Sequence, residues 1–344
     1  MTTIKDVARL AGVGLGTASR VISGKGSVSP ATEEKVRKAI EQLGFRPSHA
    51  ARSLLTGSTK MIGVYIPMLK GTFYTPILQV IDTELRNAGL HMVVAFGVGE
   101  GDARSQALEG IDFLIERGCD GLVVLSNALS EPEVAALAAK ARLVVLNHRY
   151  AVIPEQCLIA DHAEGGRQAA RVLLGEGHRR IAVIGGPASA PDNVERLNGF
   201  LEELARSGID TGKLWLAESD FSPEGGWKAA RALVGSGYSF SAVFCANDEM
   251  AVGALSYFQE VGIQVPEQAS VLGYDDTPSA EFSAPRLTTV HIPWREMTRN
   301  GLNVLLKLCY GIERPVERSF PVSVTWRSSV AKAPRPHSTK RSSS

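Results

Sequence analysis

The sequence predicts a small all-α head of helix-turn-helix type followed by an α/β body of two Rossmann-like lobes. Two observations indicate this fold. The first 45 residues carry three short helical patterns, and from residue 61 onward apolar runs of strand length alternate with helical patterns. With 344 residues, of which 44% are hydrophobic, the chain is long enough for the head and two further cores.

The first helix is expected over residues 4–11 and the second over residues 15–22. Thr3 precedes the first helix and Asp6 follows three residues later, a spacing typical of a capping box. Apolar residues at positions 4, 7, 8 and 11 share one helical face, and Gly12 suits the left-handed conformation in which helices often end. Because so tight a glycine turn separates the two helices, the pattern predicts helix-turn-helix.

A third helix is expected from Pro30 to Leu43, since Ser29 supplies a hydroxyl cap and proline suits the first helical position. Residues 1–60 contain ten Lys and Arg against four Asp and Glu, a net charge of +6, whereas the rest of the chain has 27 against 32. The near-neutral total therefore hides a basic head. Such asymmetry is typical of a chain that docks on phosphates.

Five sequence blocks follow one another through the head and the segment after it. They are Ile4-Lys5-Asp6-Val7-Ala8-x-x-Ala11-Gly12-Val13, Thr17-Ala18-Ser19-Arg20-Val21, Val28-Ser29-x-x-Thr32-x-x-Lys35-Val36, Leu43-Gly44-Phe45-x-Pro47 and Ala51-Arg52-Ser53-Leu54. These blocks closely resemble the head and hinge of the LacI/GalR family of bacterial transcriptional repressors, and the resemblance continues to about residue 328. It implies operator binding by the head and a body like a type I periplasmic sugar-binding protein.

The second helix of a helix-turn-helix lies in the major groove of DNA, and its first residues face base edges. Arg20 is suited to a bidentate contact with guanine, the alternative being a pair with a phosphate or an acid. The family usually has a serine cap and two larger side chains where this chain has Gly14-Leu15-Gly16, so the operator sequence is left open. The candidate DNA contacts of the head are Thr3, Leu15, Gly16, Thr17, Ser19, Arg20 and Ser29.

Residues 48–55 form a short amphipathic segment between Pro47 and Gly57, too short for a stable isolated helix. The resemblance implies a hinge helix that folds on DNA and inserts Leu54 into the minor groove as an apolar wedge. The alternative is that Leu54 is an ordinary packing residue. Ser48, where the family commonly has asparagine, and Ala51 are further candidate DNA contacts.

The body should contain two parallel sheets, because its apolar strands are continuous and are separated by helices. Ligands of such sheets bind beyond the carboxyl ends of the strands, where polar and aromatic residues follow. Aromatic rings beside hydrogen-bonding groups suit a sugar. The candidate ligand contacts are Phe73, Tyr74, Asn147, Asp192, Arg196, Phe221, Asn247 and Asp275.

The resemblance implies that Arg196 and Asp275 are the most general ligand contacts, and the alternative is a structural ion pair. For Phe73, Tyr74 and Phe221 the alternative is core packing. Asp248 and Asp276 are expected to cap the helices that follow them, and Asp161 and His162 to be a cap and a solvated charge.

The expected boundaries divide the chain into five parts, and the chain is expected to cross between the lobes three times. The parts are a head over 1–46, a hinge over 47–60, a first lobe of 61–158 with 291–320, a second lobe of 159–290 with 321–329, and a disordered basic tail over 330–344.

Several classes of function are not expected. The first 20 residues contain charges throughout and resemble no signal peptide, and no apolar run is long enough to span a membrane, so a cytoplasmic protein is expected. The four cysteines lack zinc-ligand spacing and are expected to be buried thiols. No phosphate-binding loop is present, so the sequence favours neither an enzyme nor a cofactor or metal protein.

These patterns predict a DNA-binding transcriptional regulator, a dimeric repressor that a small sugar releases from a pseudo-palindromic operator. A galactoside or β-glucoside is expected, because residues 146–149 and 187–197 look most like that branch of the family. Two alternatives stay open. The ligand acts as a corepressor, or the chain is a cytoplasmic solute-binding module.

Overall fold

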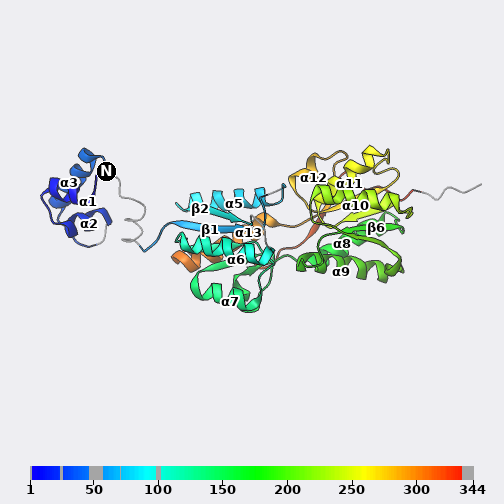
Figure 1. Ribbon diagram of the computed structural model, residues 1–344, viewed down its shortest axis with the longest axis horizontal. Helices are drawn as coiled ribbons and strands as arrows, with labels where there is room; N and C mark the ends of the chain where they lie inside the picture. Colours follow the sequence, from blue (N-terminus) through cyan, green and yellow to red (C-terminus); the bar gives the residue numbers. More distant parts are fainter. Residues whose placement is uncertain (1, 24–25, 46–56, 70, 98–101, 335–344) are drawn as a thin grey trace, which may run out of the picture.

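The computed structural model describes residues 2–23, 26–45, 57–69, 71–97 and 102–334, which form a helical head and an α/β body (Figure 1). The body has two lobes, each built on its own sheet. The predicted fold class is confirmed by this arrangement.

The head packs three helices around a small core. They are α1 (Ile4–Ala11), α2 (Leu15–Ser23) and α3 (Pro30–Leu43). Val7, Ala18 and Val36 are fully buried among them. Gly12 and Gly44 end α1 and α3 in the left-handed conformation, which costs glycine little because it has no Cβ atom.

The first lobe contains a five-stranded parallel sheet in the order β2-β1-β3-β4-β5. Its strands are β1 (Met61–Ile66), β2 (His91–Phe96), β3 (Gly121–Val124), β4 (Leu143–Leu146) and β5 (Cys157–Leu158). Its helices are α5 (Tyr74–Asn87), α6 (Ala103–Glu116), α7 (Glu131–Lys140) and α13 (Trp294–Tyr310), with a 3₁₀ turn at Pro154–Gln156. Helices α5 and α13 cover one face of the sheet, and α6 and α7 cover the other.

The second lobe contains a six-stranded sheet in the order β11-β10-β9-β8-β6-β7, in which β11 runs antiparallel to β10. Its strands are β6 (Ile181–Gly185), β7 (Trp215–Glu218), β8 (Ala242–Cys245), β9 (Ser270–Asp275), β10 (Thr288–His291) and β11 (Ser323–Thr325). Its helices are α8 (His162–Gly175), α9 (Pro191–Arg206), α10 (Pro223–Gly235), α11 (Asp248–Glu260) and α12 (Pro278–Phe282), with a 3₁₀ turn at Thr211–Lys213. Helices α8 and α9 pack on one face, and α10 and α11 on the other.

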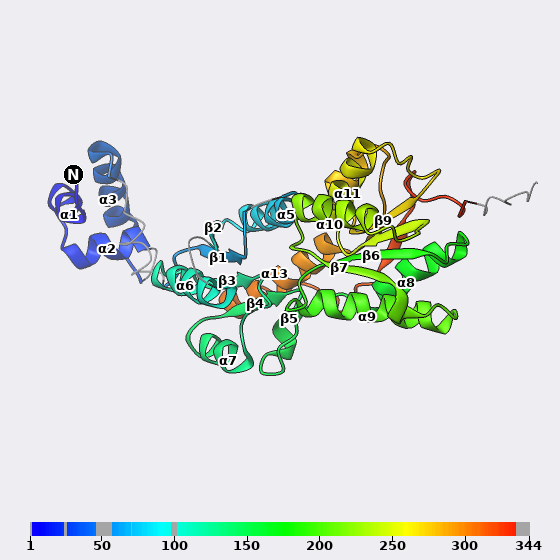
Figure 2. The same ribbon diagram turned by 45° about the vertical axis from the view of Figure 1, so that its right-hand side comes forward.

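The chain passes between the lobes three times (Figure 2). The first passage lies between β5 and α8, the second between β10 and α13, and the third between α13 and β11. Because β10 and β11 are neighbours in the second sheet, the second and third passages leave the second lobe side by side.

Two glycines allow α8 and α9 to approach closely. A Cβ atom on Gly166 of α8 would overlap the backbone oxygen of Arg196 on α9, and a Cβ atom on Gly199 would overlap the backbone of Ala163. The close approach fixes α9 against α8, and thereby fixes the backbone from which the Arg196 side chain extends.

The body ends later than the sequence predicted. Val330 is buried, and the backbone of Ala331 exchanges hydrogen bonds with the Ser270 hydroxyl and accepts one from His178. The N–H of Ala333 donates to the Glu176 carbonyl oxygen. The predicted disordered tail was therefore placed too early, because these main-chain contacts leave no hydrophobic pattern in the sequence.

The described residues lack two features. None of the helices they form is long and apolar enough to cross a membrane. No group of three or more His, Cys, Asp and Glu side chains among them is arranged to hold a metal ion.

Candidate functional site

Helix α2 presents the predicted base-reading residues on the surface of the head. Leu15 is 46% exposed, Gly16 and Arg20 are exposed, and Thr17 and Ser19 are half-buried. Arg20 donates from Nε to the Gly16 carbonyl oxygen at 3.2 Å, and it forms no ion pair with an acid in the part of the chain that the structure describes. Its charge is therefore available at the head surface.

The two other predicted contacts of the head lie at helix starts. The backbone N–H and the hydroxyl of Thr3 both donate to the Asp6 carboxylate, at 3.0 and 2.7 Å. The Ser29 hydroxyl caps α3 by accepting from the Thr32 N–H. Both residues are exposed at positive ends of helix dipoles, where anions bind favourably. Ser48, Ala51 and Leu54 lie outside the described residues.

Arg196 lies at the junction of the two lobes and is only 2% exposed. Its guanidinium carbon lies 3.7 Å from the centre of the Tyr274 ring, and Nη1 donates to the Ala246 carbonyl oxygen. Nη2 lies 3.5 Å from the Asp192 carboxylate and 4.0 Å from that of Asp275. Its Nε atom is buried without a hydrogen-bond partner.

Asp275 faces Arg196 from the end of β9 and is 6% exposed. Its backbone has a φ of 106°, a conformation that costs a residue with a side chain free energy. Burial raises the pKa of its carboxyl well above the ordinary value, although the charge of Arg196 opposes the shift. Its Oδ1 atom also lacks a hydrogen-bond partner. The buried guanidinium of Arg196 and the buried carboxyl of Asp275 thus face each other with unused hydrogen-bonding capacity.

The first lobe contributes two asparagines to this junction. Asn127, after β3, and Asn147, after β4, each donate to the Asp192 carboxylate at 3.3 Å. Because the Asn147 amide nitrogen faces Asp192, its oxygen faces His162 and accepts from Nε2 at 2.6 Å. His162 Nδ1 then accepts from the Tyr274 hydroxyl at 3.0 Å. These contacts join the lobes around Arg196 through the Asp192 carboxylate and through neutral amide, imidazole and hydroxyl groups.

A second link between the lobes joins the loop before α5 to α11. The backbone N–H and the hydroxyl of Thr72 both donate to the Glu249 carboxylate, at 2.6 and 2.7 Å. The Thr72 hydroxyl also lies 3.2 Å from that of Ser279. A Cβ atom on Gly71 would press against Glu249, so the loop approaches this closely because residue 71 is glycine.

Aromatic rings line the same junction. Phe73 packs edge to face against both Tyr74 and Trp294, with ring centres 4.9 Å apart in each pair. The indole N–H of Trp294 is buried without a partner. Phe221 comes from the second lobe, has a φ of 63°, and packs its ring where a side chain on Gly186 would clash. The junction therefore combines polar groups without partners and apolar rings.

The chain matches two family models. The model of bacterial regulatory proteins of the lacI family matches residues 3–48, and that of a periplasmic binding protein-like domain matches residues 170–330. The HTH-type transcriptional regulator AscG of Escherichia coli (strain K12) is 31% identical over 334 residues, 96% of this chain and 98% of AscG. The chain belongs to the LacI family of bacterial regulatory proteins.

Solved structures agree with this assignment. A "transcriptional regulator of LacI family from Burkhoderia phymatum" is 48% identical, with a TM-score of 0.77, over 79% of this chain and 99% of that one. The lac repressor dimer bound to operator and the anti-inducer ONPF is 28% identical, with a TM-score of 0.82, over 96% and 99%. A complex of the regulator CelR with cellobiose is 32% identical, with a TM-score of 0.68, over 96% and 100%.

Membership of the LacI family makes this chain a DNA-binding transcriptional regulator. The predicted family is confirmed, and so is the prediction of a regulator instead of an enzyme, since the relatives are named as transcriptional regulators and repressors.

Two polar residues of this LacI-family protein, Asp248 and Asp276, do not cap the helices that follow them as predicted. Asn247, not Asp248, caps α11 by accepting from the Met250 N–H at 2.9 Å, and its amide nitrogen donates to the Phe221 carbonyl oxygen. Asp248 is fully buried, and Asp276 caps no helix. Cap preference alone does not decide between adjacent residues. The extended backbone of Asn247, with a φ of −152°, makes it the cap.

His162 was predicted to be solvated but is only 2% exposed, because Asn147 and Trp294 of the first lobe lie against it. Only Asp161 acts as predicted, accepting from the Glu164 N–H. Trp294 and Glu249 were not singled out, since neither follows a strand directly. Asn127 was also missed, although the strand-end rule that found Asn147 applies to it.

Proposed function

We propose that a small sugar binds between the lobes and controls operator binding by a homodimer of this protein. One observation carries the proposal: Arg196 Nε, Asp275 Oδ1 and Trp294 Nε1 are all buried without hydrogen-bond partners. An unsatisfied buried group costs about 1–3 kcal/mol, more when charged, so a ligand that supplies partners gains that free energy. The hydroxyls of a sugar donate and accept at once, as these atoms require.

The proposed contacts divide by chemistry. Arg196 donates to ring or hydroxyl oxygens, and Asp275 accepts from neighbouring hydroxyls. Phe73, Tyr74 and Phe221 offer faces and edges to the CH groups of the sugar ring.

Asn147 and Asp192 hydrogen bond to each other across the lobes and would exchange that contact for sugar hydroxyls. Asn247 acts indirectly, because its side chain caps α11 and supports Phe221.

We infer that the sugar is a galactoside or a β-glucoside. The relative CelR was solved with cellobiose, which is a β-linked glucose disaccharide, and CelR covers nearly the whole chain. The blocks at residues 146–149 and 187–197 favour the same class.

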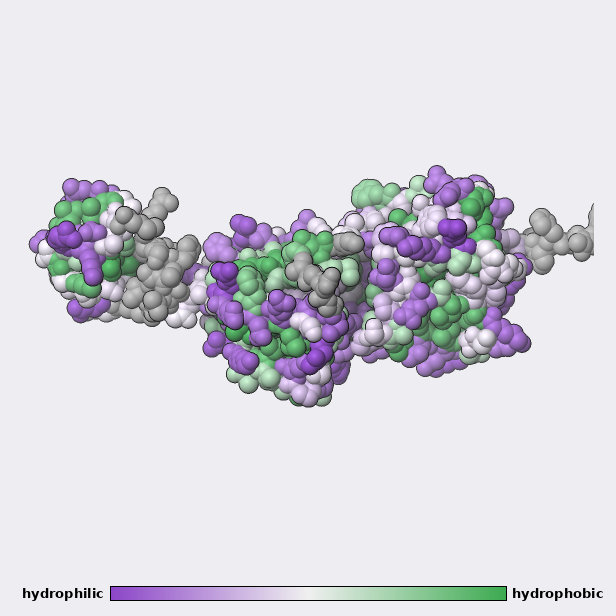
Figure 3. Space-filling model, in the orientation of Figure 1, coloured by the Kyte–Doolittle hydropathy of each residue, from purple (hydrophilic) through white to green (hydrophobic). Residues whose placement is uncertain are grey.

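The proposed dimer follows from the two-fold symmetry of operators, since two heads must reach half-sites about one helical turn apart. Exposed apolar side chains offer contact area: Phe282 is 82% exposed at the end of α12, and Phe113 is 41% exposed on α6. Figure 3 shows hydrophobic residues exposed among hydrophilic ones on the visible face of the first lobe. The lac repressor was solved as a dimer on its operator.

Fluorescence anisotropy on DNA from upstream of the protein's own gene tests the proposal, with and without cellobiose, galactose and aryl β-glucosides. Release from DNA by one of these sugars in the wild type, and loss of that response in Asp275→Asn with sugar-free DNA binding intact, is the expected result. If the sugar tightens DNA binding, it raises operator affinity instead of lowering it and is a corepressor. If Asp275→Asn and Arg196→Lys both bind the sugar normally, the site is wrong.

A further inference from the structure

Two consecutive residues at the end of β9 have left-handed backbones. Asp275 has a φ of 106° and Asp276 a φ of 58°. Residues with side chains seldom adopt such conformations, which persist only where neighbouring contacts enforce them. The contacts that enforce this turn therefore also fix the carboxylate of Asp275, which faces Arg196.

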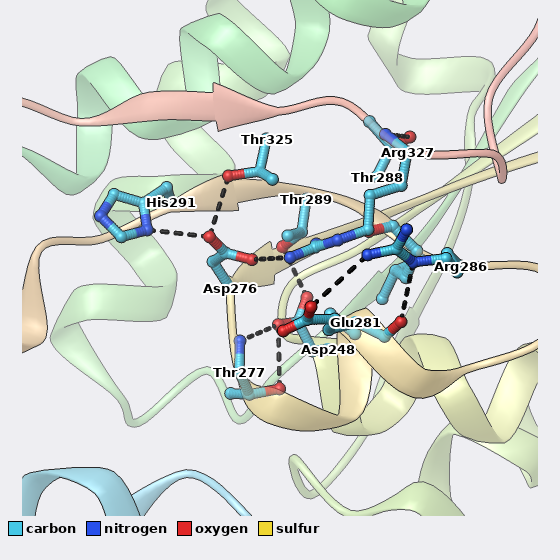
Figure 4. Close-up of polar contacts among 12 residues, drawn as sticks. Asp248, Asp276, Thr277, Glu281, Arg286, Thr288, Thr289, His291, Thr325 and Arg327 are labelled. Atoms are coloured by element: carbon cyan, nitrogen blue, oxygen red, sulfur yellow. Dashed lines mark hydrogen bonds and ion pairs between the residues drawn. The ribbon is translucent and has the colours of Figure 1, made fainter.

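The Asp276 carboxylate receives three donors from two other strands and the segment after them (Figure 4). Oδ2 accepts from His291 Nδ1 at 2.9 Å and from the Thr325 hydroxyl at 2.8 Å, and Oδ1 accepts from Arg327 Nη2 at 2.7 Å. Although burial opposes ionisation, these donors hold the pKa of Asp276 at about 2, so it is charged at neutral pH.

The donors lie where the chain changes lobe. His291 is the last residue of β10, directly before the second passage, and Thr325 is the last residue of β11, which follows the third passage. Arg327 is itself held, because its backbone N–H donates to the Thr288 hydroxyl and Nη1 donates to the Leu287 carbonyl oxygen. One carboxylate thus joins the turn at Asp275 to two of the three connections between the lobes.

The buried carboxylate of Asp248 binds Thr277, the residue that follows this turn. Asp248 accepts from the backbone N–H and the hydroxyl of Thr277, at 2.7 and 3.0 Å, and from the Thr289 hydroxyl at 2.6 Å. Because the side chain of Asp276 and the backbone of Thr277 are both held directly after Asp275, Asp275 has little freedom to move unless β10 and β11 move with it.

We propose that Asp276 is a positioning residue that couples the effector site to the hinge: it holds Asp275 in place and ties it to β10 and β11 where they enter the passages between lobes. The inference rests on the proposed function, since it takes Asp275 as a sugar contact. A sugar that pulls on Asp275 then displaces both passages together. The lobes rotate as a consequence, and the operator affinity changes.

The test compares three variants of the full-length protein: Asp276→Asn, Thr325→Val and the control Glu281→Gln. Thr325→Val removes one hydrogen bond to Asp276 and keeps the β-branched shape. Glu281 pairs with Arg286 on the exposed surface nearby and does not contact Asp276. Anisotropy gives the operator Kd without sugar and with saturating sugar, and the ratio of these values is the coupling. Titration of the sugar gives its own Kd.

We expect Thr325→Val to lower the coupling ratio about fivefold while the sugar Kd stays within about twofold of wild type. Asp276→Asn should lower the ratio further and weaken sugar binding about tenfold or more. Glu281→Gln should match wild type. The inference is overturned if Asp276→Asn and Thr325→Val both lower the thermal stability but leave the coupling ratio unchanged. The hydrogen bonds of Asp276 would then only stabilise the fold.

Hydrogen exchange separates this inference from the proposed function. In Asp276→Asn without sugar, amides of residues 275–277 and 288–291 should lose protection together. Unchanged protection overturns the inference even if sugar binds. If these amides lose protection but no sugar changes operator binding by the wild type, Asp276 still ties the turn to β10 and β11. The assignment of Asp275 as a sugar contact is then refuted.

Discussion

The pH dependence of stability around His162 gives a quantitative prediction. Burial lowers the pKa of His162 to about 3, with the positive charge of Arg196 acting in the same direction and Asp192 opposing it. The unfolded chain titrates near 6.5, so between pH 6.5 and 3 the unfolded state binds more protons than the folded state. Stability must therefore fall as the pH falls through this window. At pH 5 the loss is about 2 kcal/mol relative to pH 8.

Other groups overlap this window with the opposite sign. Burial raises the pKa of Asp248 to about 7, despite the donors from Thr289 and Thr277 that oppose the shift, so its contribution favours the folded state as the pH falls from 7 towards 4. The pH dependence of the wild-type free energy of unfolding is the sum of such contributions. A difference between the wild type and His162→Gln isolates the histidine, since glutamine keeps an amide N–H for Asn147 and does not titrate.

Urea unfolding between pH 5 and 8 measures this difference. All four tryptophans lie in the body, so their fluorescence reports its unfolding. We expect His162→Gln to gain about 2 kcal/mol relative to the wild type on going from pH 8 to pH 5. The matched control is His91→Gln, because His91 is exposed at the start of β2. Parallel profiles for the wild type and His162→Gln would refute the assignment of a buried, neutral histidine.

Three further predictions concern other parts of the molecule. Arg20→Ala should weaken operator binding by about 1–3 kcal/mol and relax specificity at one base pair, whereas a uniform loss on all sequences in the anisotropy assay would indicate a phosphate contact. Asp120 binds the backbone of Thr59 and Lys60 and the Tyr310 hydroxyl, so Asp120→Asn should weaken operator binding without changing the sugar Kd; a changed sugar Kd would contradict this. Phe200 stacks on Phe244 with ring centres 4.3 Å apart and is fully buried, so Phe200→Ala should cost about 3–5 kcal/mol in urea unfolding, and a cost below 1 kcal/mol would contradict the packing.

The sequence predicted the fold class because each element leaves a local pattern. The strands β1, β3, β4, β6, β8 and β9 are nearly all buried along their length and are therefore continuous apolar runs. The polar residues beyond β4 and β9, Asn147 and Asp275, were found for the same reason, since the carboxyl ends of parallel strands meet at one edge of a sheet.

The parts that the sequence did not predict depend on contacts between distant segments. Trp294 begins a helix that packs back on the first lobe, and its ring meets Phe73 more than 200 residues earlier. His162 is buried by contacts with Asn147 and Trp294 of the first lobe and with Tyr274. Asp276 has the local sequence of a helix cap, but its partners on β10 and β11 are closer than the next helix. Contacts between residues so far apart in the chain leave no periodic pattern in the sequence.

The strength of the contacts between the lobes sets how an effector is able to act. Among the residues that the structure describes, side-chain hydrogen bonds link the lobes near the site: Asn127 and Asn147 with Asp192, His162 with Asn147, and Thr72 with Glu249 and Ser279. A hydrogen bond contributes about 0.5–1.5 kcal/mol net, and up to about 3 kcal/mol with a charged partner. A hundredfold change in operator affinity needs about 2.7 kcal/mol of coupling. A sugar that replaces the two asparagines at Asp192 would therefore redistribute free energy of the same order as this coupling, in addition to acting on the hinge through Asp275 and Asp276.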